Sequence, residues 1–212
     1  MQTDLRYLED QDLVRVDTVA TRNDGRWVHP ERIEVVTLTK YGKQLGGEAG
    51  KIPLDQKLYH GLAKPRKVEH DTQIYRAYLK EAERIERGGG KNLRVELDFE
   101  LKHKVQKAIY AARKAEPDRE LQEIKQYVAQ RLDLPYIRNK IEIPDARIHY
   151  EQDRGSQAAF SDIEVVSAAY RPQHLRAKKQ AGFRAYASSS DRAAMSARIE
   201  DEHHTLDWVL EL

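Results

Sequence analysis

The sequence contains no cysteine, which excludes a disulfide framework, a thiolate nucleophile and cysteine-ligated zinc. It also lacks any apolar run near the roughly 20 residues that cross a bilayer, and its start lacks the blocks of a signal peptide. We therefore expect no membrane segment and a cytoplasmic location. Neither sign of charge dominates, because 37 Lys and Arg stand against 35 Asp and Glu. Nucleic-acid binding would therefore need a local basic patch.

Carboxylates and basic residues gather between residues 143 and 186. The segment SDIEVVS predicts a strand in which Asp162 and Glu164 share one face, because successive strand side chains point to opposite faces. An earlier strand begins at Asp145, directly after a proline. Whether Asp145 lies beside Glu164 depends on the register of the two strands, which the pattern leaves open.

The first fifty residues predict a helix, a strand, a turn, a second strand and a helix. The turn contains Asn, Asp and Gly, which tolerate the positive φ of tight hairpins, and Thr39 can cap the following helix. The segments YLEDQDLVRV and VVTLTKYGKQL resemble winged-helix DNA-binding proteins. The earlier helices of that module would lie before Met1, so we expect a truncated module or one reduced to its wing. A hairpin used for packing or dimerisation is the alternative.

A linker rich in glycine and basic residues is expected next, and then a long helix over 69–87. Asp71 lies at the start of this helix, within an apolar stripe that also contains Tyr75. It is therefore either an N-cap or a carboxylate that faces a cleft. The elements expected after this helix are strands at 93–99, 145–151 and 161–167, and helices at 100–115, 117–132 and 172–186.

Three features occur together: His70-Asp71 at the head of a helix, Pro144-Asp145 at the head of a strand, and the segment DIEVVSAAYRPQHLRAKKQAGFRAYA. Together they resemble the replication-relaxation family of bacterial and plasmid-borne proteins, over most of the chain from about Leu5 to Ala187. The resemblance implies a DNA-binding protein of plasmid or mobile-element replication and relaxation. DNA is the implied partner; partner proteins of a replication or mobilisation complex, and a homodimer, stay open.

The same residues resemble the PD-(D/E)xK nuclease core, in which a helix, three strands, a helix and a strand follow one another. We therefore expect an α/β (α+β) fold with a restriction-endonuclease-like central mixed sheet flanked by helices. A winged-helix-like β-hairpin segment would precede it. The expected boundaries are 1–50 for the winged-helix-like segment, 51–68 for the linker, 69–190 for the nuclease-like domain with a helical insertion at 100–132, and 191–212 for a C-terminal tail.

In such nucleases carboxylates hold Mg²⁺ or Mn²⁺, which activates water and stabilises the transition state. The lysine expected two residues after the second acid is Val166 here, so a lysine from the following helix would have to replace it. The implied metal ligands are Asp71, Asp145, Asp162 and Glu164. The implied catalytic residues are Asp145, Glu164, Lys178 and Lys179.

The same residues also allow less specific roles. Asp145 can be a strand-end residue, and Glu164 a surface residue or a partner of Arg147. The alternative function is a non-catalytic DNA-binding accessory or transcription factor with a degenerate nuclease fold, and a third is an assembly module without nucleic acid. The residues expected to contact DNA phosphates are Arg22, Arg26, Arg171, Arg176, Lys178 and Lys179.

Overall fold

The computed structural model of the protein describes residues 2–23, 26–50, 52–53, 55–62, 68–152, 157–198 and 206–212. Within these ranges the chain forms seven helices and nine strands, so the fold is mixed α/β. It divides into two compact units, Met1–Thr72 and Gln73–Leu212. None of the helices in these ranges has both the length and the apolar character needed to traverse a bilayer.

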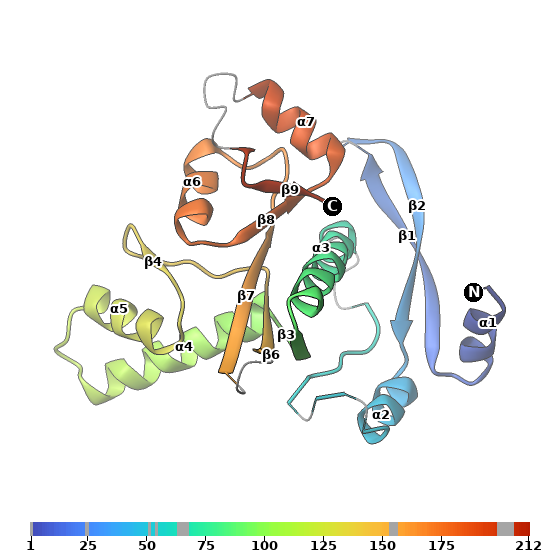
Figure 1. Ribbon diagram of the computed structural model, residues 1–212, viewed down its shortest axis with the longest axis horizontal. Helices are drawn as coiled ribbons and strands as arrows, with labels where there is room; N and C mark the ends of the chain where they lie inside the picture. Colours follow the sequence, from blue (N-terminus) through green and yellow to red (C-terminus); the bar gives the residue numbers. More distant parts are fainter. Residues whose placement is uncertain are drawn as a thin grey trace. The chain divides into compact units, whose positions relative to one another are not determined.

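The first unit follows the expected order of helix, strand, strand and helix. Its two strands form a long antiparallel ladder in which Val14 faces Leu38, drawn in blue in Figure 1. The second strand begins well before Ile33, where the sequence pattern predicted its start. The elements are α1 (Gln2–Asp10), β1 (Val14–Asn23), β2 (Arg26–Leu38) and α2 (Lys40–Glu48).

The start of α2 is held against the start of β1 by Thr39 and Gly42. The Thr39 hydroxyl oxygen accepts the Gly42 N–H at 2.9 Å, which confirms the expected cap, and the hydroxyl donates to the Asp12 carbonyl. A Cβ atom on Gly42 would lie 1.9 Å from the Leu13 carbonyl oxygen. Glycine is therefore required by the close approach of the two backbones.

Replacing Gly42 by alanine should destabilise the protein by about 2 kcal/mol or more, because the Leu13 backbone would have to move. The matched control is Gly47→Ala in the same helix, where an added Cβ meets nothing within 4 Å. That change should stabilise by about 0.5–1 kcal/mol through helix propensity. Urea denaturation followed by circular dichroism measures the stability of both variants. Equal changes in stability would contradict the close approach of Gly42 to the Leu13 backbone.

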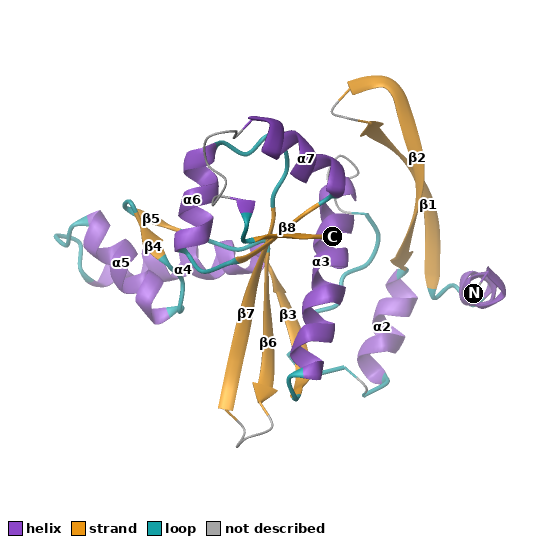
Figure 2. Cartoon of the chain, turned by 45° about the horizontal axis from the view of Figure 1, so that its top comes forward, coloured by secondary structure: helices purple, strands orange, loops and turns teal. Residues whose placement is uncertain are grey.

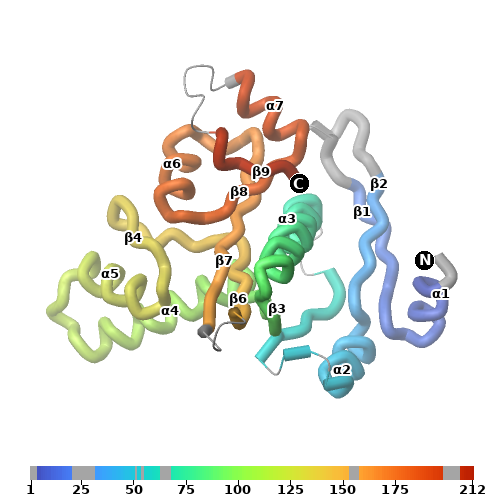
Figure 3. Tube along the Cα trace, viewed as in Figure 1, coloured from blue at the N-terminus to red at the C-terminus, as the bar shows by residue number. Residues whose placement is uncertain are grey.

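The second unit is built on a mixed five-stranded sheet in the order β3-β6-β7-β8-β9. Its first three strands pair antiparallel, and the last three pair parallel. Residues 191–212, expected as a tail outside the domain, contribute the edge strand β9 (Figure 3). The strands are β3 (Gly90–Leu97), β6 (Ala146–Gln152), β7 (Gln157–Val165), β8 (Arg184–Ala187) and β9 (Val209–Glu211).

Helices cover both faces of this sheet (Figure 2). Helix α3 (Val68–Arg87) packs on the face that carries Ile148 and Ile163. Helices α6 (Pro172–Gln180) and α7 (Ser189–Arg198) pack on the opposite face, against Val166 and Ala185. The alternation along β7 therefore points Ile163 and Val165 into the core under α3, whereas Phe160, Asp162 and Glu164 share the opposite face.

A helical hairpin is inserted between β3 and β6, as the sequence predicted. Its helices enclose a small core of their own around Val105, Ile124 and Val128, and a two-stranded ribbon follows them. The elements are α4 (Asp98–Ala115), α5 (Leu121–Arg131), β4 (Tyr136–Ile137) and β5 (Lys140–Ile141).

Three local expectations were wrong. Phe99 belongs to helix α4 and is 49% exposed, whereas the alternation predicted it inside a strand. Tyr75 is 60% exposed instead of part of a buried stripe. The helix that starts at Pro172 does not reach Tyr186, because Gly182 adopts a φ of +77°, and strand β8 follows it.

The buried face of α3 contains a fully buried carboxylate, Glu81. Its oxygens accept hydrogen bonds from Ser161 at 2.6 Å and from Arg184 and Tyr186 at 2.7 Å, and Arg84 also donates to it. Burial alone raises the pKa of Glu81, but the bonds from these groups lower it to about 2. Glu81 therefore joins α3 to β7 and β8 as an ionised group.

Glu81→Gln should lower the free energy of unfolding by about 2–4 kcal/mol, since it removes the charge that these donors share. The ionised carboxylate contributes stability above its ordinary pKa of 4.5, and this is lost as pH falls towards 2. The difference between variant and wild type should therefore shrink over that interval in denaturation experiments. Glu83→Gln, which changes an exposed carboxylate on the same helix, should cost less than about 0.5 kcal/mol.

Candidate functional site

Asp145 and Glu164 lie next to each other on the sheet face that α6 covers. The β6–β7 ladder is extended by the Asp145 N–H, which donates to the Ile163 carbonyl at 3.0 Å. The Asp145 carboxylate in turn accepts the Val165 N–H at 2.8 Å. The structure thus supplies the register that the sequence left open, and it brings these two expected site residues together.

The Glu164 carboxylate is almost completely buried, with 2% of the residue exposed. One of its oxygens, Oε1, lies 3.0 Å from the Lys178 ammonium and accepts the Tyr170 hydroxyl at 2.9 Å. The other oxygen, Oε2, is buried without a hydrogen-bond partner. An unsatisfied buried carboxylate oxygen is costly, and such an atom calls for an explanation.

Lys178 reaches from α6 into a group of oxygen atoms. Besides Glu164, its ammonium lies 3.4 Å from a Glu142 oxygen and donates to the Ile143 carbonyl at 3.1 Å. Its side chain is only 15% exposed, whereas Lys179 is exposed. Of the two lysines suggested by the sequence, Lys178 is therefore the one that meets the acids.

The surroundings of Glu164 disfavour its charged form. Burial and the neighbouring Asp145 carboxylate raise the pKa of Glu164 to about 7, although Lys178 and Tyr170 act in the opposite direction. Burial and the same carboxylates also raise the pKa of the Tyr170 hydroxyl well above its usual range. Tyr170 therefore acts as a hydrogen-bond donor to Glu164 at neutral pH.

Asp162 shares the face of Glu164, as the strand alternation predicted, but it has a different partner. Both of its carboxylate oxygens bind Arg147, at 2.7 and 2.8 Å. Arg147 also donates to the carbonyls of Leu132 and Asp133, at 2.9 and 2.7 Å. The buried pair therefore ties the end of the helical insertion to the sheet, and Arg147 pairs with Asp162 instead of Glu164.

The other expected site residues are not gathered here. Asp71 is exposed near the start of α3 and falls in the first unit, whereas the cluster around Glu164 belongs to the second. Arg171 and Arg176 are exposed on or beside α6. The side chains of Arg22 and Arg26 lie outside the part of the chain that is described.

Two members of the cluster, Tyr170 and Glu142, were missed by the sequence interpretation. Tyr170 lies in the turn between β7 and α6, and Glu142 lies in the segment that leads into β6. Neither position belongs to a periodic pattern, so only their closeness in sequence to Glu164 and Asp145 could have signalled them.

The carboxylates that could ligate a divalent cation here are Asp145 and Glu164, which lie on neighbouring strand positions. Across the described ranges, no three or more His, Asp or Glu side chains are grouped closely enough to hold a metal ion by themselves. Mg²⁺, however, commonly takes only one or two carboxylates and completes its six oxygen ligands with water and phosphate. Asp145 and Glu164, whose Oε2 is unsatisfied, would supply two carboxylates of such a set.

Comparison with models of known protein families, with curated proteins and with solved structures finds no match to this chain. Its function must therefore be inferred from the chemistry of the site.

Glu164→Gln should stabilise the protein most at and above pH 7. The raised pKa means that the folded protein holds a proton that the unfolded chain releases, so wild-type stability falls as pH rises from 4.5 to about 7. The glutamine side chain does not ionise, so the variant does not lose stability in this way. Its extra stability over wild type should therefore vanish near pH 4.5. Thermal unfolding over this pH range measures it, with the exposed Glu123→Gln as control. A gain in stability that does not vary with pH would contradict the raised pKa of Glu164.

Proposed function

We propose that the protein is a DNA-processing enzyme of the PD-(D/E)xK type, which hydrolyses a phosphodiester bond with Mg²⁺ or Mn²⁺. The observation that carries this proposal is the meeting of Asp145, Glu164 and Lys178 on one buried face of the sheet. Asp145 immediately precedes β6, Glu164 lies in β7 and Lys178 lies in α6, so the three residues come from separate elements. The proposed setting is plasmid or mobile-element replication and relaxation, as the sequence resemblance implies.

The chain order of the second unit supports this proposal. Helix α3, strands β3, β6 and β7, helix α6 and strand β8 occur in this order along the chain (Figure 2), and the nuclease core has the same order of helix, three strands, helix and strand. The helical hairpin interrupts this order as an insertion between the first and second strands. Acids at the start of the second strand and within the third correspond to Asp145 and Glu164.

Each residue of the site has a distinct role in this proposal. Asp145 and Glu164 supply carboxylate oxygens for the cation, which when bound activates water and stabilises charge on the phosphate. Lys178, reaching the acids from α6, supplies a positive charge for the phosphate oxygens and replaces the lysine missing at Val166. Tyr170 is a positioning residue, because its hydroxyl holds one oxygen of Glu164.

A non-catalytic DNA-binding protein with a degenerate nuclease fold is the second candidate. It is favoured by the Lys178 ammonium, which already pairs with Glu164 and approaches Glu142, and so neutralises acids that a cation would need. In that case α6 would contact phosphates through its exposed basic residues, and the affinity for DNA would fall steeply with salt.

Cleavage of plasmid, single-stranded and branched DNA in Mg²⁺ or Mn²⁺ tests the first proposal. Lys178→Met should reduce the rate about 100-fold or more, since it removes a charge that acts on the reacting phosphate. Its matched control is Lys179→Met, which changes the adjacent exposed lysine and should leave cleavage within a few-fold. Asp145→Asn should abolish both cleavage and the heat of Mn²⁺ binding in calorimetry.

Cleavage that is equally fast in Lys178→Met and in wild type would exclude the proposed role of this lysine. Binding of DNA without cleavage, and without any heat of Mn²⁺ binding, would favour the second candidate. Circular dichroism on each variant separates a loss of chemistry from a loss of folding.

A further inference from the structure

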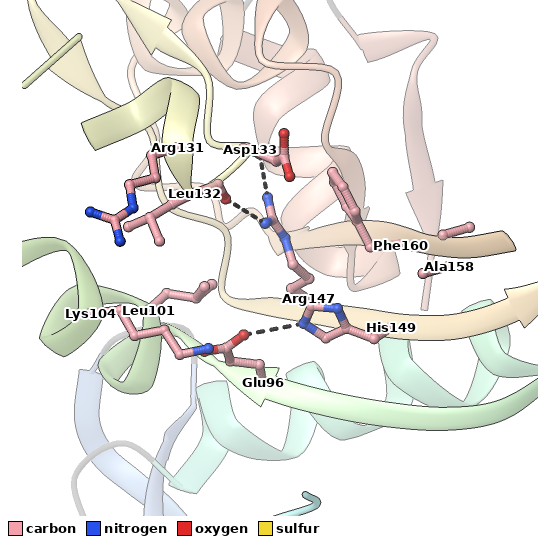
Figure 4. A pocket seen from close by; sticks show the side chains of 11 residues that line it. Glu96, Leu101, Lys104, Arg131, Leu132, Asp133, Arg147, His149, Ala158 and Phe160 are labelled. Carbon is pink, nitrogen blue, oxygen red and sulfur yellow. Dashed lines mark hydrogen bonds and ion pairs between the residues drawn. The ribbon is translucent and has the colours of Figure 1, made fainter. Parts of the chain in front are cut away.

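Figure 4 shows a pocket that is lined in part by Arg147, His149 and Phe160. Phe160, Asp162 and Glu164 alternate along β7 and therefore share one face. The pocket has a volume of about 340 Å³, which lies within the range of small-ligand sites. Its polar and aromatic lining includes Glu96, Lys104, Arg131, Arg147, His149 and Phe160.

Phe160 presents an aromatic surface in the wall of this pocket. The ring is 43% exposed, and the guanidinium carbon of Arg147 lies 4.0 Å from its centroid. Arg147 cannot easily move, because it is held by both oxygens of Asp162 and by two backbone carbonyls. Figure 4 shows the ring beside this guanidinium. One face of the Phe160 ring is thus covered by a guanidinium that is itself held in place.

The rest of the lining carries both signs of charge, because Glu96 and Asp133 are acidic whereas Lys104 and Arg131 are basic. Glu96 is 3% exposed and binds His149 Nε2 at 3.1 Å and the Lys104 ammonium at 2.5 Å. These bonds outweigh the effect of burial and lower the pKa of Glu96 to about 2, so it remains an anion that orients both donors. Arg131 adds a second exposed positive charge to the lining.

We propose that this pocket binds one unpaired nucleotide of a DNA strand, with its base stacked on Phe160 and its phosphate near Lys104 and Arg131. The choice of DNA as the ligand rests on the proposed function. Aromatic stacking combined with basic groups is how proteins hold single strands, and a base within a duplex could not reach the ring. Along β7 the strand rise places Phe160 about 13 Å from Glu164 on the same face of the sheet.

The test is a comparison of two single-stranded oligonucleotides by fluorescence anisotropy in EDTA, where no cleavage occurs. One is a thymidine decamer, and the other carries abasic sites in place of its central nucleotides. Wild type should bind the intact strand about ten-fold more tightly, as expected for one stacked base. Phe160→Ala and Phe160→Leu should bind the two strands equally, and Phe160→Trp should keep the preference. Tyr110→Ala, which removes an exposed tyrosine on α4, should also keep it.

Phe160→Leu keeps an apolar cover over Arg147, so a lost preference in that variant reflects the missing aromatic face. A preference that survives in Phe160→Ala and Phe160→Leu, or wild type that binds both strands equally or not at all, would overturn the nucleotide pocket. None of these binding results decides whether the protein is a nuclease, because the cleavage assay tests that proposal separately. Conversely, a preference that depends on Phe160 in a protein that never cleaves DNA would support the pocket and refute the nuclease.

Discussion

The register between β6 and β7 is the constraint on which the candidate site depends. It is fixed by the ladder itself, by the buried Arg147–Asp162 pair that spans it, and by the Asp145 carboxylate bound to the Val165 N–H. A slip of one residue would turn Glu164 towards the core under α3 and remove it from Lys178. Asp162, which the sequence predicted as a metal ligand, instead pairs with Arg147 and so helps to hold the two strands in this register.

Two buried glutamates on opposite faces of this sheet illustrate two uses of the same side chain. Glu81 has four donating neighbours, and its pKa is lowered to about 2, so its charge stabilises the fold. Glu164 has a lysine, a tyrosine and an unsatisfied oxygen, and burial raises its pKa to about 7. A carboxylate held in this unfavourable state is typical of sites that bind or react with something else.

The sequence predicted the order of most elements, the alternation along β7 and, among the acids of the cluster, Asp145 and Glu164, because these follow from local periodicity and turn chemistry. It did not predict that the helix after Pro172 ends early, since that depends on the positive φ of Gly182. It also could not show that Arg147 would pair with Asp162, or that Tyr170 would reach Glu164. Those contacts depend on strand register and on where a helix packs, which no local pattern encodes.

The most direct test of the central claim is a crystal structure of the protein soaked in Mn²⁺, with the ion located by its anomalous scattering. We predict one strong peak within coordination distance of both Asp145 and Glu164 Oε2, with the Lys178 ammonium moved away from Glu164. A peak at some other site, or no peak with Lys178 still paired to Glu164, would contradict a metal-dependent nuclease and leave a DNA-binding scaffold.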